Sequence, residues 1–259
     1  MPPGTFHFAG VTLLVTHYNR SGSLARLLDT FRGLGCSFED TVISDDGSHA
    51  EHLQRVEELQ KEYGFRLITG PVNKGLGHNL NKGQDAVKTP FTLYVQEDFV
   101  PLAAFPPRLT HALGLMRERP GLDITRFYAY FRYPYLKAES GGFSSMRFKL
   151  WYPGYRKFYM YSDHPHLRRC DFTKKFGRYA EGVKGDITEY RMMMSFLQKK
   201  GRGLFYDDFK SLFDQRNDAA EPSTMKRNYW RESGHFLVSG LRHFYRHVKF
   251  NLDYLLRSF

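Results

Sequence analysis

The chain has 259 residues, 41% hydrophobic and 25% charged, which is typical of a folded globular protein rather than a disordered one. Its two cysteines, Cys36 and Cys170, exclude a disulfide framework or a cysteine-rich zinc site, and no apolar run reaches the roughly 18–20 residues of a membrane span. Residues 1–100 hold 9 basic and 12 acidic side chains, whereas residues 101–259 hold 29 basic and 15 acidic ones. The basic second part suits either an anionic partner or a solvated surface.

The first hundred residues alternate predicted strands and helices. Ser48 and Glu51 form a capping-box pattern that predicts the start of the second helix. Strands are expected at Val11–Thr16, Thr41–Ser44, Phe65–Thr69 and Phe91–Val95, with helices near 24–31, 49–59 and 79–87. This order predicts an α/β fold, with a mostly parallel sheet flanked by helices on both faces.

The remaining residues are less regular. An aromatic and basic stretch at 127–161 is broken by glycine and proline turns, and polar residues at 215–224 indicate a linker. Further elements are expected as helices at Leu102–Arg119 and Glu189–Lys200, a short strand at Leu204–Tyr206, and a last helix at Phe236–Phe259.

Polar clusters follow three of the predicted strands. They are Thr16–Arg20, Asp45–Ser48 and Gln96–Asp98. Ligands of open α/β sheets bind beyond the carboxyl ends of the strands, so these clusters indicate one binding site.

Each cluster has a functional and a structural interpretation. The adjacent carboxylates of Glu97 and Asp98 suit a hard divalent cation, or else an exposed acidic turn. Asp45 and Asp46 can accept hydrogen bonds from a base or ribose, or else belong to a turn. The glycines of the segment 73–79 would let the backbone approach a ligand, although the segment matches neither a P-loop nor a dinucleotide fingerprint.

Taken in order, the segments VTLLVTHYNR, VISDDGS, NKGLGHNLNKGQDAVKTPFTLYVQEDFVP and CDFTKKFGRYAEG resemble the inverting glycosyltransferases of family 2, over roughly residues 9–215. The resemblance implies the GT-A fold and a nucleotide-sugar donor, most simply a UDP-sugar. The nucleotide contacts that it implies are Thr16, Tyr18, Asn19, Arg20, Asp45, Asp46, Lys74, Gly75 and Asn79.

The family's Asp-any-Asp metal motif maps onto Gln96-Glu97-Asp98, where the first Asp is replaced by Gln. The resemblance implies that Asp98 binds Mn²⁺ or Mg²⁺, while Glu97 assists or contacts the ribose or sugar. A metal-binding His that often follows the last strand in the family is missing here. Asp214 and Gln215 are the candidate substitutes, and use of fewer protein ligands is the alternative.

An inverting transfer needs a general base for the acceptor hydroxyl. By resemblance, the family places an acidic residue at the start of a helix, about a dozen residues before a glycine. Counting back from Gly201 favours Glu189, with Asp186 as the alternative. Helix capping is the structural interpretation of both carboxylates.

The last helix alternates an apolar stripe with arginines and lysines, which predicts either docking on an anionic membrane surface through residues 236–259 or packing against the domain. The aromatic stretch 127–161 is the expected acceptor wall, because aromatic faces stack on sugars. By resemblance, the acceptor is a glycan or lipid-linked saccharide in cell-surface polysaccharide synthesis. A non-catalytic sugar-binding scaffold and a nucleic-acid binder are the rivals, and no nucleic-acid partner is expected, because no RNA-binding signature accompanies the aromatics.

These interpretations divide the chain into three parts. Residues 1–100 form the nucleotide-sugar-binding half, residues 101–215 form the acceptor-binding half of the same domain, and residues 216–259 form a linker and the basic amphipathic helix. The N-terminal residues lack the basic start of a signal peptide, so we expect a cytoplasmic protein, with peripheral attachment to the inner face of the membrane as an option.

Overall fold

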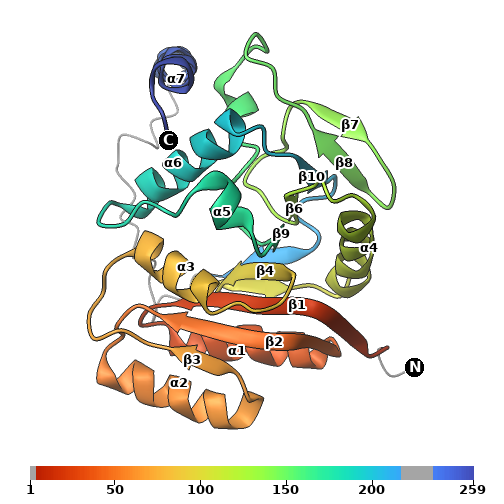
Figure 1. The fold of residues 1–259 in the computed structure, drawn as a ribbon, viewed down its shortest axis with the longest axis vertical. Helices are drawn as coiled ribbons and strands as arrows, with labels where there is room; N and C mark the ends of the chain where they lie inside the picture. Colours follow the sequence, from red (N-terminus) through yellow and green to blue (C-terminus); the bar gives the residue numbers. More distant parts are fainter. Residues whose placement is uncertain (1–3, 217–235) are drawn as a thin grey trace.

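The computed structural model describes residues 4–216 and 236–259, with side chains from residue 240 onward in the last segment. Its first part alternates strands and helices as expected (Figure 1). The elements are β1 (Phe6–His17), α1 (Ser21–Gly33), β2 (Cys36–Asp45), α2 (Ala50–Tyr63), β3 (Arg66–Ile68), α3 (Leu76–Asp85) and β4 (Phe91–Gln96).

The second part is built from shorter elements. They are β5 (Phe99–Pro101), α4 (Phe105–Glu118), β6 (Ile124–Arg126), β7 (Leu136–Ala138), β8 (Phe143–Met146), the 3₁₀ turn η1 (Tyr155–Phe158), β9 (His166–Arg169), α5 (Phe172–Phe176), α6 (Gly185–Gln198), β10 (Gly203–Tyr206), β11 (Phe213–Gln215) and α7 (Phe236–Leu256).

A nine-stranded sheet runs through both parts in the order β3-β2-β1-β4-β9-β6-β10-β8-β7, while β5 and β11 pair separately. The strands β3, β2, β1 and β4 are parallel to one another. Beyond β4, β9 is antiparallel to both of its neighbours, and the β10–β6 pair is parallel. The α/β architecture predicted from the sequence is confirmed, and its parallel portion is the N-terminal half of the sheet.

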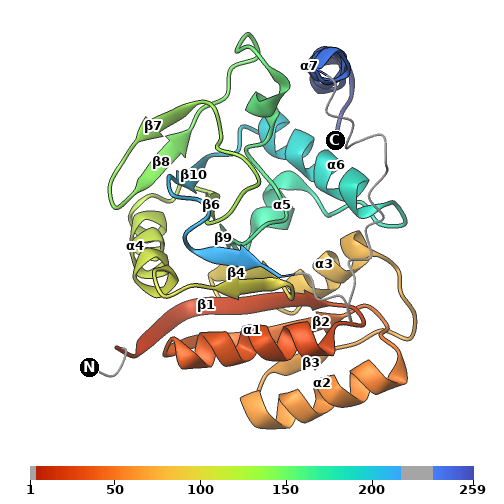
Figure 2. The same cartoon turned by 180° about the vertical axis from the view of Figure 1, so that it is seen from behind.

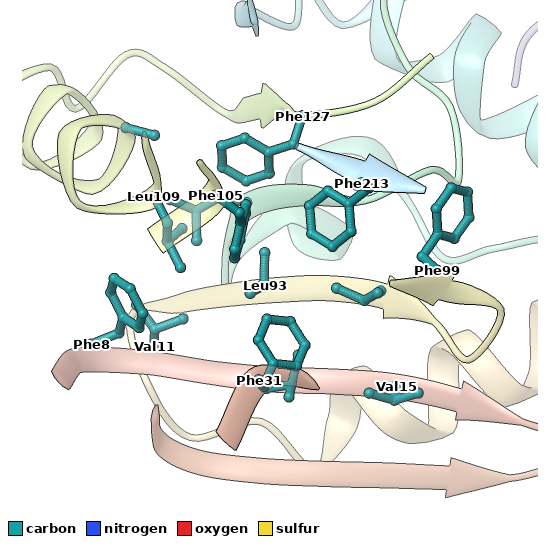
Figure 3. Close-up of a cluster of buried hydrophobic side chains, with 14 of the residues drawn as sticks. Phe8, Val11, Val15, Phe31, Leu93, Phe99, Phe105, Leu109, Phe127 and Phe213 are labelled. Carbon is teal, nitrogen blue, oxygen red and sulfur yellow. The ribbon is translucent and has the colours of Figure 1, made fainter. Parts of the chain in front are cut away.

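The two faces of the sheet bury separate apolar cores because side chains alternate along each strand. Val11 and Val15 of β1 join Phe31 of α1 and Phe105 of α4 in the first core (Figure 3). Leu14, one residue from Val15, points into the second core. Figures 1 and 2 show the two helical layers, with α1 on one side of the sheet and α3 on the other.

The predicted C-terminal helical extension is confirmed as α7, which packs over η1 and α6 (Figure 2). Phe250 of α7 lies between Tyr190 and Phe158, with ring centroids 4.9 and 5.6 Å away. Most of the linker predicted at 215–224 lies outside the described residues, which stop at 216 and resume at 236. In the parts of the chain that are described, no helix has the length and apolar character needed to cross a membrane.

Candidate functional site

The three polar clusters predicted from strand ends meet at one edge of the sheet. β1 pairs in parallel with β2 and β4, and the register places Thr16 opposite both Ser44 and Gln96. His17 lies opposite Asp45 in the same register. The carboxyl ends of all three strands therefore converge, as expected for the ligand-binding edge of an open α/β sheet.

Asp45 is the central acceptor of this edge. Its Oδ1 accepts hydrogen bonds from His17 Nδ1 at 2.7 Å and from Ser48 Oγ at 2.5 Å. Its Oδ2 accepts from the backbone amides of Gly47 and Ser48, both at 3.0 Å. Burial raises the pKa of Asp45, but the bonds from His17 and Ser48 outweigh burial and leave its pKa below the ordinary value. The fully buried carboxylate is therefore ionised and committed to holding the loop after β2.

Ser48 has a different role from the one expected. Helix α2 begins at Ala50 with His49 as its N-cap and no side-chain capping bond, so the capping-box prediction is wrong. The Ser48 hydroxyl instead accepts from the amide of Asn19 at 2.8 Å, and Asn19 Oδ1 accepts from the amide of His49 at 2.8 Å. Asn19 adopts a φ of 53°, a left-handed conformation that asparagine tolerates. These bonds join the loop after β1 to the loop after β2.

Asp46 holds the glycine-containing segment before α3. Its two carboxylate oxygens accept from the amides of Lys74 at 3.1 Å and Gly75 at 2.8 Å. Gly47, with a φ of +73°, leaves no room for a side chain, because a Cβ there would lie 2.5 Å from the carbonyl carbon of Val72. The side chain of Lys74 is exposed at this edge. The structure thus brings these residues to the ends of β1 and β2, as the sequence predicts.

Two other predicted contacts are internal. Asn79 is buried, accepts a hydrogen bond from Ser44 Oγ at 2.7 Å and donates to the carbonyl of His17 at 3.3 Å. The Thr16 hydroxyl is 3.0 Å from the Tyr94 hydroxyl in the core. Tyr18 is half-buried, and its ring centroid lies 6.5 Å from that of His49. Of these three residues, Tyr18 is the one that is not buried.

The acidic pair after β4 lies beside Arg20. Arg20 Nη1 is 3.5 Å from both Glu97 Oε1 and Asp98 Oδ2. Burial, and then the neighbouring Asp98 carboxylate, raise the pKa of Glu97 to about 8. Asp98 Oδ2 also accepts from Gln215 Nε2 at 3.0 Å, whereas Asp98 Oδ1 is buried and has no hydrogen-bond partner among the described residues. One carboxylate oxygen is therefore available to a cation.

This arrangement fits a metal that takes few protein ligands. Within residues 4–216 and 236–259, no group of three or more His, Cys, Asp or Glu side chains could hold an ion by itself. Mg²⁺ and related cations commonly use one or two carboxylates and complete their shell with phosphate oxygens and water. The unpartnered oxygen of Asp98 satisfies that requirement. Of the two candidate substitutes for the missing histidine, Gln215 contacts Asp98, whereas Asp214 pairs with Arg216 at 2.9 Å.

Glu189 lies in the second turn of α6, facing Asp163. Its Oε1 accepts a hydrogen bond from the Asp163 amide at 3.2 Å. Burial, and then the Asp163 carboxylate, raise the pKa of Glu189 above its ordinary value. Glu189 also lines a pocket of about 80 Å³ with Arg126, Tyr130 and His164. The carboxylate therefore faces a small cavity at a raised pKa, which are the properties of a general base.

Asp186 occupies the first turn of the same helix, where no side-chain bond caps the N-terminus. It is half-buried and contributes to the raised pKa of Glu189 through charge repulsion. The pocket that contains Glu189 does not include Asp186 among its lining residues. The geometry consequently favours Glu189 of the two predicted bases.

Sequence reasoning missed the residues that support Glu189. Tyr161 donates to Asp163 Oδ1 at 2.5 Å and is 2.6 Å from the Tyr179 hydroxyl, to which Arg168 also donates. Asp163 Oδ2 is buried and has no hydrogen-bond partner among the described residues. Tyr161, Asp163 and Arg168 lie in stretches without a motif. Their connection depends on the antiparallel strand β9 beside β4, which the sequence pattern did not predict.

Comparison with known proteins places these observations in a family. The model of the family described as "Glycosyl transferase family 2" matches residues 12–180, which is more than half of the chain. No curated protein sequence matches the chain closely enough to count as a relative.

Solved structures resemble the fold at low sequence identity. S. aureus TarS 1-349, in complex with UDP-GlcNAc, has a TM-score of 0.62 at 17% identity, covering 84% of this chain and 61% of TarS 1-349. Glucosyl-3-phosphoglycerate synthase from Mycobacterium tuberculosis, in complex with Mn²⁺, UDP and glucosyl-3-phosphoglycerate, has a TM-score of 0.53 at 12% identity, covering 81% and 73%. The chain thus spans about three fifths of the length of TarS 1-349. These similarities confirm the predicted GT-A fold.

Proposed function

Because the chain belongs to glycosyl transferase family 2, we propose that it is an inverting glycosyltransferase using a nucleotide-sugar donor, with UDP as the nucleotide. The observation that carries the proposal is the unpartnered buried oxygen of Asp98, located where the ends of β1, β2 and β4 converge. The acceptor is a glycan or a lipid-linked saccharide, in the assembly of a cell-surface polysaccharide.

The donor nucleotide would lie across the loops after β1 and β2. Tyr18 provides a ring surface for the base, and the exposed Lys74 provides a cation for the diphosphate. Gly75, with a φ of +87°, allows the backbone to come close to the ligand. Asp45 and Asp46 act mainly by fixing these loops, since their oxygens accept bonds from the chain itself.

The residues at the end of β4 suit a divalent cation beside the diphosphate. Asp98 would hold the ion, and Gln215 and Arg20 orient the Asp98 carboxylate through its other oxygen. When bound, Mn²⁺ or Mg²⁺ would act as a Lewis acid that neutralises the charge of the leaving diphosphate. Glu97, at 3.5 Å from Arg20, remains the candidate for a ribose or sugar contact.

Glu189 would remove the proton of the acceptor hydroxyl. The acceptor oxygen then bonds to the anomeric carbon on the face opposite the diphosphate, and the bond from that carbon to the phosphate oxygen breaks with its electron pair. The diphosphate leaves as the anion and the proton stays on Glu189. Because the new bond forms on the face opposite the bond that breaks, the configuration at the anomeric carbon inverts. The pocket lined by Glu189, Arg126, Tyr130 and His164 is the space that we assign to that hydroxyl.

Calorimetric titration of UDP, and then of GDP, tests the donor half of this proposal. We expect UDP to bind more tightly with Mn²⁺ than without it, and we expect Asp98→Ala to abolish the metal-dependent part. The matched control is Asp214→Ala, which removes a carboxylate of β11 that pairs with Arg216. If Asp98→Ala binds UDP equally with and without Mn²⁺, the result supports Asp98 as the metal ligand. If the variant keeps the full metal dependence, Asp98 is not the metal ligand.

The acceptor half is tested separately by donor turnover. UDP-sugars are supplied one at a time, with release of UDP measured in the wild type and in Glu189→Gln. A protein that binds UDP with Mn²⁺ but releases none from any UDP-sugar would favour the alternative, a non-catalytic sugar-nucleotide-binding scaffold. The Gln at position 96, in place of the family's first Asp, is the feature that favours this alternative.

A further inference from the structure

The outer face of α7 exposes a continuous apolar stripe. Within the described residues the large exposed apolar side chains number eleven, and seven of them lie on this helix. We call them the outer stripe: Leu241, Phe244, Tyr245, Val248, Leu252, Leu255 and Leu256. Their spacing of three, four and seven residues places them on one side of an α-helix. Such a concentration marks an interaction surface rather than scattered surface apolar residues.

The outer stripe is not the face through which α7 packs on the domain. The opposite side of the helix carries Phe250 and Asp253, which are only 7% and 6% exposed. Tyr190 donates to Asp253 Oδ2 at 2.5 Å, and Gln198 donates to the carbonyl of Tyr254 at 2.9 Å. The domain therefore packs on this opposite side of α7 and leaves the outer stripe exposed.

The charge around the stripe is positive. Arg242 and Lys249 border it on the helix, and Arg257 follows Leu256 directly. The acidic side chain of the described part of α7, Asp253, faces inward and pairs with Lys249 and Arg257. A second copy of the chain docking through the same stripe would bring these cations together, whereas an anionic surface would complement them.

A basic pocket of about 640 Å³ adjoins the C-terminal end of the stripe. Phe176, Met192 and Phe259 supply its apolar part. Its cationic lining consists of Arg178, Arg191, Lys199 and Arg257, and none of its lining residues carries an acidic side chain.

Two of these cations already have carboxylate partners outside the pocket. Arg178 pairs with Asp85 at 2.8 Å, and Arg257 pairs with Asp253 at 3.1 Å. Lys199 donates to the carbonyl of Phe176 at 3.0 Å. Arg191 is exposed and makes no ion pair with any described residue, so Arg191 and Lys199 are the cations with charge left to neutralise.

We propose that α7 docks on the surface of an anionic lipid bilayer, with the outer stripe in the boundary between headgroups and acyl chains and a lipid phosphate in the basic pocket. An amphipathic helix with an apolar arc and bordering Arg and Lys side chains binds such surfaces by apolar burial together with electrostatic attraction. This inference concerns attachment only. It stands whether or not the donor site binds UDP.

Cosedimentation with vesicles tests the proposal. We expect the protein to bind vesicles of phosphatidylcholine and phosphatidylglycerol, to bind pure phosphatidylcholine at least about tenfold more weakly, and to detach as salt is raised. The triple variant Phe244→Ser/Leu252→Ser/Leu255→Ser should lose binding to both. Its matched control is Trp151→Ser, which removes a side chain that is 77% exposed but does not belong to α7.

The pocket is tested by Arg191→Ala/Lys199→Ala, which should weaken binding to anionic vesicles about tenfold and leave the weak binding to neutral vesicles unchanged. Inorganic phosphate should release no more wild-type protein from the vesicles than chloride does at the same ionic strength. If phosphate releases more protein than chloride, the pocket binds a free anion and not a lipid phosphate. Circular dichroism confirms that each variant is folded. Binding that survives in the triple variant, or a wild-type dimer in light scattering that this variant converts to monomer, would overturn the proposal.

Discussion

The side-chain amide of Gln215 donates a hydrogen bond of 3.0 Å to Oδ2 of Asp98, across 117 residues of sequence. The small β5–β11 sheet makes this contact possible, because it pairs Gln215 with Phe99, the residue that follows Asp98. The Arg216 amide bonds to the Asp98 carbonyl at 2.8 Å in the same place. A late strand thus orients the carboxylate that is proposed to hold the metal.

Gln215→Ala should weaken Mn²⁺-dependent UDP binding by about 10- to 100-fold, as is typical when a hydrogen-bond partner of a metal ligand is removed. Titration of UDP at fixed Mn²⁺ measures the effect. Asp214→Ala, on the same strand but paired with Arg216, should change the affinity less than about twofold. Equal losses in the two variants would indicate a general disturbance of β11 rather than a specific contact with Asp98.

Glu189→Gln should lower kcat by about 10²- to 10⁴-fold and leave the affinity for UDP unchanged, because a general base acts on the acceptor and not on the nucleotide. The wild-type rate should rise with pH through a pKa above the ordinary glutamate value, since burial and the Asp163 carboxylate favour the protonated form. Initial rates between pH 5 and 9 measure this limb. The Asp186→Asn variant should keep the same rise of rate with pH. If the rise persists in Glu189→Gln, a residue other than Glu189 is the general base.

The same raised pKa has a consequence for stability. A carboxyl group whose pKa is raised in the folded state contributes stability that is fully present below its unfolded pKa and is lost as the pH rises through the folded pKa. Glu189→Gln should therefore be more stable than the wild type at pH 9 and show a smaller fall between pH 5 and 9. Urea unfolding at the two pH values tests this. A fall equal to that of the wild type would contradict the burial of a titrating Glu189.

Asp45→Ala should destabilise the protein by about 3 kcal/mol, because it leaves the buried donor of His17 and the half-buried donors of Gly47 and Ser48 without an acceptor. Urea denaturation at pH 7 measures the change. Asp29→Ala is the matched control, since Asp29 pairs with Arg32 on the surface and should cost less than about 1 kcal/mol. A small effect at Asp45 would mean that the loops after β1 and β2 are held by other contacts.

Gly77→Ala should destabilise the protein by about 1–3 kcal/mol, because a Cβ at this position would lie 2.1 Å from the carbonyl oxygen of Ala180. Gly114, which also lies in a helix, has open space around the corresponding position. Gly114→Ala should accordingly stabilise by about 0.5–1 kcal/mol through helix propensity. Thermal unfolding should show a lower Tm for the Gly77 variant and a higher Tm for the Gly114 variant. A higher Tm for Gly77→Ala would contradict the close approach of α3 to the backbone at Ala180.

The sequence was sufficient for the parallel half of the fold and for the location of the candidate site. Apolar strands such as Val11–Thr16 alternate with amphipathic helices, and their polar ends lie in adjacent strands, so Asp45 and Asp98 could be assigned to one edge. The strands themselves extend further than the apolar runs. β1, for example, begins at Phe6.

The sequence was insufficient where burial depends on distant partners. Strand β9 contains Arg168, which no periodicity assigns to a core, yet its guanidinium is fully buried between Gln84 and Tyr179. The choice between Asp214 and Gln215 likewise depends on the pairing of β11 with β5. The Gln84–Arg168 contact and the β5–β11 pairing join segments more than eighty residues apart, and local patterns do not encode them.

The carboxylates of Asp45 and Asp46 hold the loop after β2 and the segment before α3 through bonds that the chain makes with itself. The conformational entropy of these loops is therefore lost when the protein folds and not when a nucleotide arrives. Binding at this edge should consequently show a small heat-capacity change and little dependence on loop closure. The backbone amides of Gly47, Ser48 and Gly75 should exchange their hydrogens slowly in the free protein, as expected of a rigid receptor.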